Sequence, residues 1–183
     1  MGVTHVKSTP ITNLDATPII YSNAGIGAPG ALVSVSATIT PAASDSTGST
    51  YAMCRVPTSA ILKHVWFTGQ AQSAGTFDVS VYYSDSTTDG TAVANQGVVV
   101  PTTGATFIAD AIVNASAVAM TEVLGYGGTA AGWDPSMINK KLWDALGLTT
   151  DPGGFFDIYL VCTDTAVTTG TGKVMLAVEY VVD

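Results

Sequence analysis

A short pattern of residues occurs twice in this chain, and it constrains the fold more than any other sequence feature. Residues 77–85 read FDVSVYYSD, and residues 156–164 read FDIYLVCTD. In both copies apolar and polar residues alternate in the same phase, which predicts strands with one buried and one solvated face. We therefore expect two framework strands in equivalent places of a two-sheet sandwich, with Asp78 and Asp157 on the solvated faces.

Further strand-like segments follow at short spacing, separated by runs of Gly, Pro, Ser, Thr and Asp. The predicted strands span 17–22, 31–40, 49–56, 60–68, 76–84, 91–100, 105–113, 155–163 and 173–182. This pattern predicts an all-β fold, namely an antiparallel, jelly-roll-like β-sandwich. We expect an N-terminal arm over residues 1–16 and a single sandwich domain over residues 17–183. Residues 114–132 have no predicted structure.

One short helix is predicted near residues 135–146. Asp134 is a suitable N-cap, Pro135 favours the first helical position, and Gly147 supplies the C-terminal stop. Apolar residues recur at four-residue spacing between these ends, which gives the helix one buried stripe. They are Ile138, Leu142 and Leu146, with Trp143 beside them.

The composition is that of a component of an assembly. Charged residues make up 11% of the chain, against roughly 25% in ordinary soluble domains, and apolar residues make up 47%. Such a chain leaves large neutral or apolar surfaces, which usually mark contacts with other subunits. The net charge is −8 and the six cations are scattered, whereas a phosphate-binding surface needs clustered cations. We therefore expect homo-oligomer contacts and no direct binding of nucleic acid.

No membrane-spanning or exported segment is expected. Residues 16–44 carry no charge, but prolines and glycines interrupt them, and a spanning helix needs about 20 uninterrupted apolar residues. No basic start followed by an apolar run predicts a signal peptide. Without export, Cys54 and Cys162, both in phase with inward-facing residues, are expected to be buried and reduced. A disulfide remains an alternative only if their strands are neighbours.

No catalytic, metal or cofactor site is predicted. Asp78 and Asp157 could form the carboxylate pair of a glycoside hydrolase, with about 5–10 Å between carboxyl groups. No aromatic and carboxylate residues gather around them in sequence, so we expect a non-enzymatic protein. Residues 85–90 read DSTTDG and could bind calcium, but they lack the spacing of an EF-hand, which favours a solvated turn. His5 and His64 have no third residue spaced to complete a zinc site, and we expect His64 on a strand surface.

Two longer segments resemble the tailed-bacteriophage virion proteins that decorate or cement the head. Residues 48–62 read GSTYAMCRVPTSAIL and lead to FDV at 77–79, and residues 172–183 read GKVMLAVEYVVD. In proteins of that type a strand ending in an Arg-x-Pro turn precedes a strand pair, and the chain closes on a valine-rich strand. The resemblance implies a jelly-roll-like sandwich on the capsid exterior, made in the host cytoplasm. It also implies binding to the major capsid protein over subunit junctions, without a catalytic motif or cofactor.

The tryptophans leave a second function open. Trp66, Trp133 and Trp143 could form a platform that stacks against sugar rings, as in a head- or tail-fibre module that binds host-surface carbohydrate. The simpler interpretation is that Trp143 belongs to the helix core and that Trp133 anchors the glycine-rich loop. For the decoration function, we expect contact residues on exposed apolar loops and on the N-terminal arm.

Overall fold

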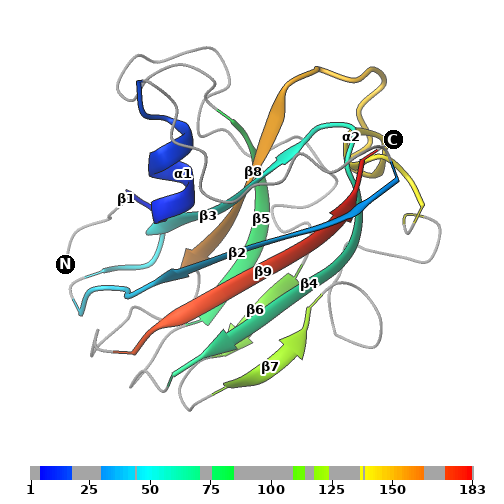
Figure 1. Cartoon of the computed structure of the whole chain (residues 1–183). Coiled ribbons are helices and arrows are strands. Elements are labelled where there is room, and N and C mark those ends of the chain that lie inside the picture. The colour runs from blue at the N-terminus through cyan, green and yellow to red at the C-terminus, as the bar shows by residue number, and fades with distance from the viewer. Residues whose placement is uncertain are drawn as a thin grey trace.

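The computed structural model of the chain shows two β-sheets packed face to face (Figure 1). The structure describes residues 5–17, 30–43, 45–70, 76–84, 109–113, 118–123, 137, 139–162 and 172–182, with the backbone alone for 109–113 and 118–122. The predicted strand 91–100, most of the predicted strand 17–22, and the helix start at Asp134 lie outside the described residues.

Five strands form one sheet and four form the other. In spatial order, the first sheet contains β1 (His5–Lys7), β3 (Thr50–Pro57), β8 (Phe155–Cys162), β5 (Thr76–Tyr83) and β6 (Ala109–Val113). The second contains β2 (Leu32–Ile39), β9 (Val174–Val181), β4 (Ile61–Gly69) and β7 (Val118–Glu122). The β7 strand lies in the stretch for which the sequence predicted no structure.

The strand pairing is nested, which defines a jelly roll. Strand β2 pairs with β9, β3 with β8, β4 with β7, and β5 with β6, all antiparallel. The chain is thus one long hairpin rolled up so that its paired strands alternate between two sheets, the double Greek-key arrangement of jelly rolls. The predicted all-β, jelly-roll-like sandwich is confirmed. Strand β1 is an addition to it and pairs parallel with β3.

The core lies between the sheets and is built from alternate residues of the strands. Every second side chain of β9 is buried, and the same period places apolar residues of β4 and β8 inward. Aromatic side chains join the two layers, since the ring centroids of Phe67 on β4 and Phe77 on β5 are 6.4 Å apart. Within the five-stranded sheet, Tyr51 on β3 meets Phe77 edge-on at 6.2 Å. Each fully buried side chain of this size contributes roughly 1.5–3 kcal/mol, so the sandwich needs no covalent staple.

The predicted helix is present in its second half as α2 (Leu142–Ala145). Gly147 has φ +76°, and it ends the helix as predicted because a left-handed residue at this position satisfies the last carbonyls. The amides of Gly147 and Leu148 donate to the carbonyls of Asp144 and Trp143 at 3.0 and 3.1 Å. A second helix, α1 (Thr9–Leu14), was not predicted, because its six residues are too few to show a helical period.

The two copies of the repeated pattern are β5 and β8, which are antiparallel neighbours in one sheet. Their inward residues are buried as predicted, with Phe77 and Phe156 both fully buried. The prediction of solvated aspartates is wrong, because Asp78 is 8% exposed and Asp157 is 3% exposed. The side of the five-stranded sheet that faces away from the core is therefore also covered at these positions, and its polar residues are buried rather than solvated.

Candidate functional site

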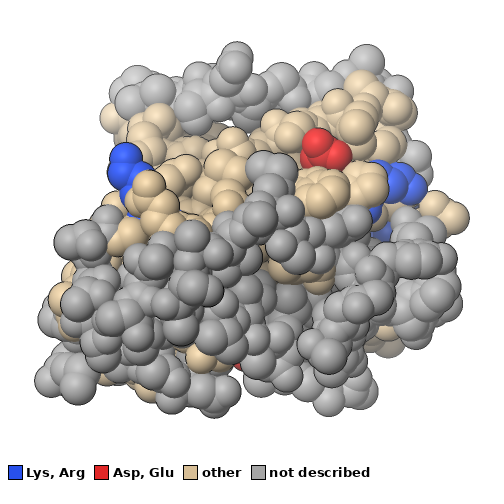
Figure 2. Space-filling view, turned by 90° about the horizontal axis from the view of Figure 1, so that it is seen from below, with Lys and Arg blue, Asp and Glu red and all other residues tan. Residues whose placement is uncertain are grey.

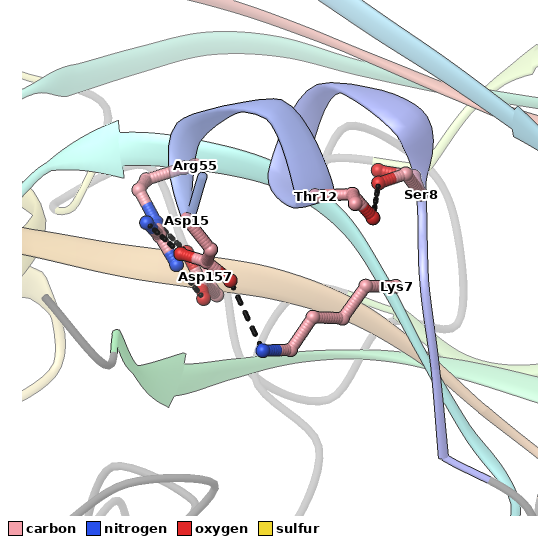
Figure 3. Close-up of polar contacts among 6 residues, drawn as sticks. All are labelled: Lys7, Ser8, Thr12, Asp15, Arg55 and Asp157. Atoms are coloured by element: carbon pink, nitrogen blue, oxygen red, sulfur yellow. Dashed lines mark hydrogen bonds and ion pairs between the residues drawn. The ribbon is translucent and has the colours of Figure 1, made fainter. Parts of the chain in front are cut away.

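Residues 5–17, the N-terminal strap, lie against β3 and β8 on the side away from the core (Figure 3). Strand β1 adds to the edge of the sheet beside β3. The Ser8 amide donates to the Ala52 carbonyl at 2.7 Å, and the Ser8 hydroxyl donates to the Met53 carbonyl at 2.6 Å. Ile11 on α1 is fully buried and is the apolar anchor of the strap. Much of the segment expected to be an arm is thus packed against the sandwich.

A buried cluster of charged side chains fastens the strap (Figure 3). The Arg55 guanidinium on β3 donates through Nε and Nη2 to the two carboxylate oxygens of Asp157 on β8, at 2.7 and 2.9 Å. Its Nη1 donates to Asp15 at the end of α1, at 2.7 Å. Lys7 on β1 donates to the other oxygen of Asp15 at 3.0 Å. The cluster therefore joins the strap, β3 and β8, which are three segments distant from one another in the sequence.

The electrostatics of this cluster are those of a structural ion pair. Burial by itself would lower the pKa of Arg55, but the hydrogen bonds that it donates to the carboxylates of Asp157 and Asp15, together with their negative charge, outweigh burial and raise that pKa. Burial raises the pKa of Asp157 against the opposing effect of Arg55. The three Arg55 donors face carboxylates, and bidentate pairing of this kind is the strongest that a guanidinium forms. All these groups are used in fastening, and the arrangement offers no proton donor or nucleophile for chemistry.

A second buried carboxylate, Asp45, lies on the connection between β2 and β3. It accepts a hydrogen bond from the Tyr51 hydroxyl at 2.7 Å and another from the Ala42 amide at 2.9 Å. Its surroundings are those of a turn-stabilising side chain, because carboxylates at such positions commonly bond to nearby backbone amides.

The aspartates Asp78 and Asp157 do not form a catalytic pair. Asp157 lies opposite Tyr82 on β5, four residues along the strand from Asp78, which corresponds to about 13 Å. That separation exceeds the spacing of the two carboxyl groups in glycoside hydrolases. No group of three or more potential metal ligands occurs among the described residues, and the suggested calcium loop at 85–90 lies outside them.

The two cysteines are free thiols on neighbouring strands. Cys54 on β3 lies opposite Ile158 on β8, four residues from Cys162. The corresponding distance of about 13 Å is nearly twice the longest Cα separation that a disulfide spans. Burial, aided by the charge of Asp157, raises the pKa of the Cys54 thiol to about 12, so this cysteine stays protonated and unreactive at neutral pH.

The histidines and tryptophans are dispersed. His64 lies half-buried on the outer surface of β4 as expected, stacked on Trp66 with 5.8 Å between ring centroids. His5 contacts the Thr50 hydroxyl at 2.7 Å on the strap. Trp143 packs against the core through α2, and Trp133 lies outside the described residues. Among the described residues, no platform of tryptophans is formed.

The outer surface of the four-stranded sheet contrasts with the cluster. The outward side chains of β2, β9 and β4, which we call the neutral face, come from alternate residues of each strand, except where a register shift in β4 leaves the half-buried Lys63 outside this set. They are Leu32, Ser34, Ser36, Thr38, Met175, Ala177, Glu179, Val181, Ile61, His64, Trp66 and Thr68. Glu179 is the one carboxylate in this set. Figure 2 shows, over the described surface seen from below, isolated charged groups separated by neutral side chains.

Among the described residues, no helix is long and apolar enough to cross a membrane.

The sequence matches no family of known proteins and no curated protein. The fold does match solved structures. A chain titled "Capsid of Ralstonia phage GP4" superposes with a TM-score of 0.60 at 13% identity, covering 98% of this chain and 99% of that one. A chain titled "Cyanophage Pam1 capsid asymmetric unit" has a TM-score of 0.41 at 15% identity, covering 92% and 96%. The first similarity shows a shared fold over the whole length of both chains.

Proposed function

We propose that the protein is a non-enzymatic virion structural protein that decorates or cements the capsid exterior of a tailed phage. The single observation that carries this proposal is the similarity of fold, end to end, to a chain from the capsid of Ralstonia phage GP4.

The chemistry of the surface supports a binding function of this kind. Burying an unpaired charge at an interface is costly, and a face with one carboxylate among twelve side chains avoids that cost. The exposed large apolar residues are Val6 on the strap, Leu32 at the start of β2 and Phe155 at the start of β8. We propose these as capsid contacts. Val6 lies on the expected arm, whereas Leu32 and Phe155 lie at the starts of strands rather than on loops as expected. Weak contacts repeated over a lattice give firm attachment through multivalency.

Binding to undecorated heads of the same phage tests the proposal. We expect saturable binding of the purified protein and a rise in the temperature at which the heads disrupt. Phe155→Ser removes an apolar side chain that is 48% exposed and should weaken binding about tenfold, which corresponds to roughly 1.4 kcal/mol. Thr150→Ser, at an exposed position of the adjoining turn, is the matched control and should bind as the parent does. Absence of saturable binding by the folded parent protein would overturn the proposal.

A further inference from the structure

The two sheets present four edge strands, and three of them carry features that block pairing with another chain. Strand β1 has three residues and includes Lys7. Strand β6 has five residues, includes Asp110 and meets a shift of register in β5. Strand β7 has five residues, includes Glu122 and meets a shift of register in β4. Short length, charge and bulges are the ways in which natural sheets protect their edges.

Strand β2 has none of these three protections, although helix α1 and strand β3 lie close to part of it. It is eight residues long, LVSVSATI, without charge, proline or glycine. Its register with β9 runs without interruption from Leu32 to Ile39. Within the described part of the chain, its backbone hydrogen-bonds to β9 alone; the Cys54 thiol approaches the Val35 carbonyl at a long 3.9 Å. A long, regular and uncharged edge is a template for strand addition.

We propose that β2 pairs antiparallel with the β2 strand of a second copy, so that two four-stranded sheets join into one sheet across a two-fold axis. The sequence of the strand is complementary to itself. Pairing centred on Ser36 sets Ser34 opposite Thr38 and Val33 opposite Ile39, which matches hydroxyl with hydroxyl and β-branched with aliphatic side chains. A two-fold interface requires this self-complementarity.

The charge of the protein favours this site for self-association. Each copy carries a net charge of −8, so two copies repel each other, and the repulsion is smallest where they meet at a surface without charge. The β2 edge and the outward residues beside it, Ser34, Ser36 and Thr38, are exposed and neutral. This inference names the surface for the homo-oligomer of the proposed function. It is tested on purified protein without capsids, so that its failure leaves the capsid-binding test unaffected.

Sedimentation equilibrium of the parent chain should give twice the 18.6 kDa mass of one copy. The double variant Ser36→Lys with Thr38→Lys places like charges across the proposed axis and should raise the dissociation constant roughly tenfold or more. The matched control is Ala177→Lys with Met175→Lys, which changes the β9 residues directly paired with Ser36 and Thr38. The control adds the same charge to the same face, one strand away from the edge, and should remain dimeric.

Three results would overturn the proposal: a monomeric parent at tens of micromolar, a β2 variant that stays dimeric, or equal dissociation of both variants. The last result would assign self-association to the neutral face rather than to the edge. Unchanged thermal midpoints of both variants relative to the parent establish that a loss of dimer is not a loss of fold.

Discussion

The outer side of the five-stranded sheet holds a buried ion-pair cluster under the N-terminal strap. The neutral face of the four-stranded sheet, in contrast, includes a single carboxylate, that of Glu179. Arg55, Asp15 and Asp157 are each less than one tenth exposed. On the neutral face the charge-free positions Ser34 and Ser36 are exposed. The charged side chains of this cluster therefore lie inside the protein, where they join segments of its own chain.

The two outer surfaces of the sandwich therefore suit two kinds of cover: a segment of the same chain over the five-stranded sheet, and a separate binding partner over the four-stranded sheet. A strap held by buried ion pairs is specific, because removing one partner leaves another charge buried and unpaired. A neutral face can bind a partner without burying unpaired charges. It also lacks the charged groups that would make binding specific for one partner. Stability should therefore be sensitive to substitutions under the strap and insensitive to those on the neutral face, while binding should show the reverse.

The largest effect is expected from Arg55→Met. The substitution leaves Asp157 and Asp15 buried without their main partner, and the free energy of unfolding should fall by about 3–5 kcal/mol. Urea unfolding followed by circular dichroism measures it. The double variant Arg55→Met with Asp157→Leu removes one of the stranded charges and should lose less. A loss below about 1 kcal/mol in the single variant would mean that water reaches the cluster.

Ile11→Ala should have the next largest effect. It removes most of the fully buried anchor of the strap and should cost about 3 kcal/mol, within the range for truncation of buried aliphatic side chains. Hydrogen exchange should show faster exchange of the Ser8 amide, which bonds to Ala52. Val6→Ala, at a partly exposed strap position, is the control and should leave the Ser8 amide protected.

The pH dependence of stability in alkaline solution tests the environment of the Cys54 thiol, which is buried between the two sheets. The Cys54 pKa is raised to about 12 in the folded protein, so between pH 9 and pH 12 the folded state keeps a proton that the unfolded chain has released. Stability from this group is complete below pH 9 and is lost as the pH rises, by at most about 1.4 kcal/mol per pH unit. Cys54→Ala should show a shallower decline in the free energy of unfolding between pH 9 and pH 11. An equal slope in both proteins would contradict the raised pKa.

The smallest effect on stability is expected from Ser34→Glu on the neutral face. The side chain is exposed on β2, and surface substitutions of this kind usually change stability by less than about 0.5 kcal/mol. Thermal unfolding measures this. The same variant should bind undecorated heads less well than the parent, and a large loss of stability with normal binding would reverse the assignment of the two faces.

Much of the sandwich could be predicted from the sequence because its strands carry local signals. The period-two alternation of β5 and β8 placed their inward residues correctly, and Gly147 marked the end of α2. Whether the outward residues are buried or solvated could not be predicted in this way. Asp157 is buried because Arg55 and a strap 142 residues away in sequence from it, at Asp15, cover it. No local pattern encodes such a long-range contact.

The strap itself was missed for a related reason. Its helix is six residues long and its strand three, so neither shows a period. The usable signals were the charges: Lys7 and Asp15 stand in the strap, and Arg55 interrupts an otherwise apolar strand. In a chain where charge is this scarce, an arginine within a core strand is itself a sign of a buried carboxylate partner.

The nested pairing has a consequence for synthesis on the ribosome. Strand β2 emerges early from the ribosome, but its partner β9 is the last of the described strands to be synthesised. Leu32 pairs with Val181, and Ile39 pairs with Val174. The inner pairs can form while the outermost pair is still incomplete, and contacts between residues so distant along the chain form slowly. During translation the uncharged LVSVSATI segment is therefore exposed without its partner, and this segment is where we expect a nascent chain to recruit a chaperone or to aggregate.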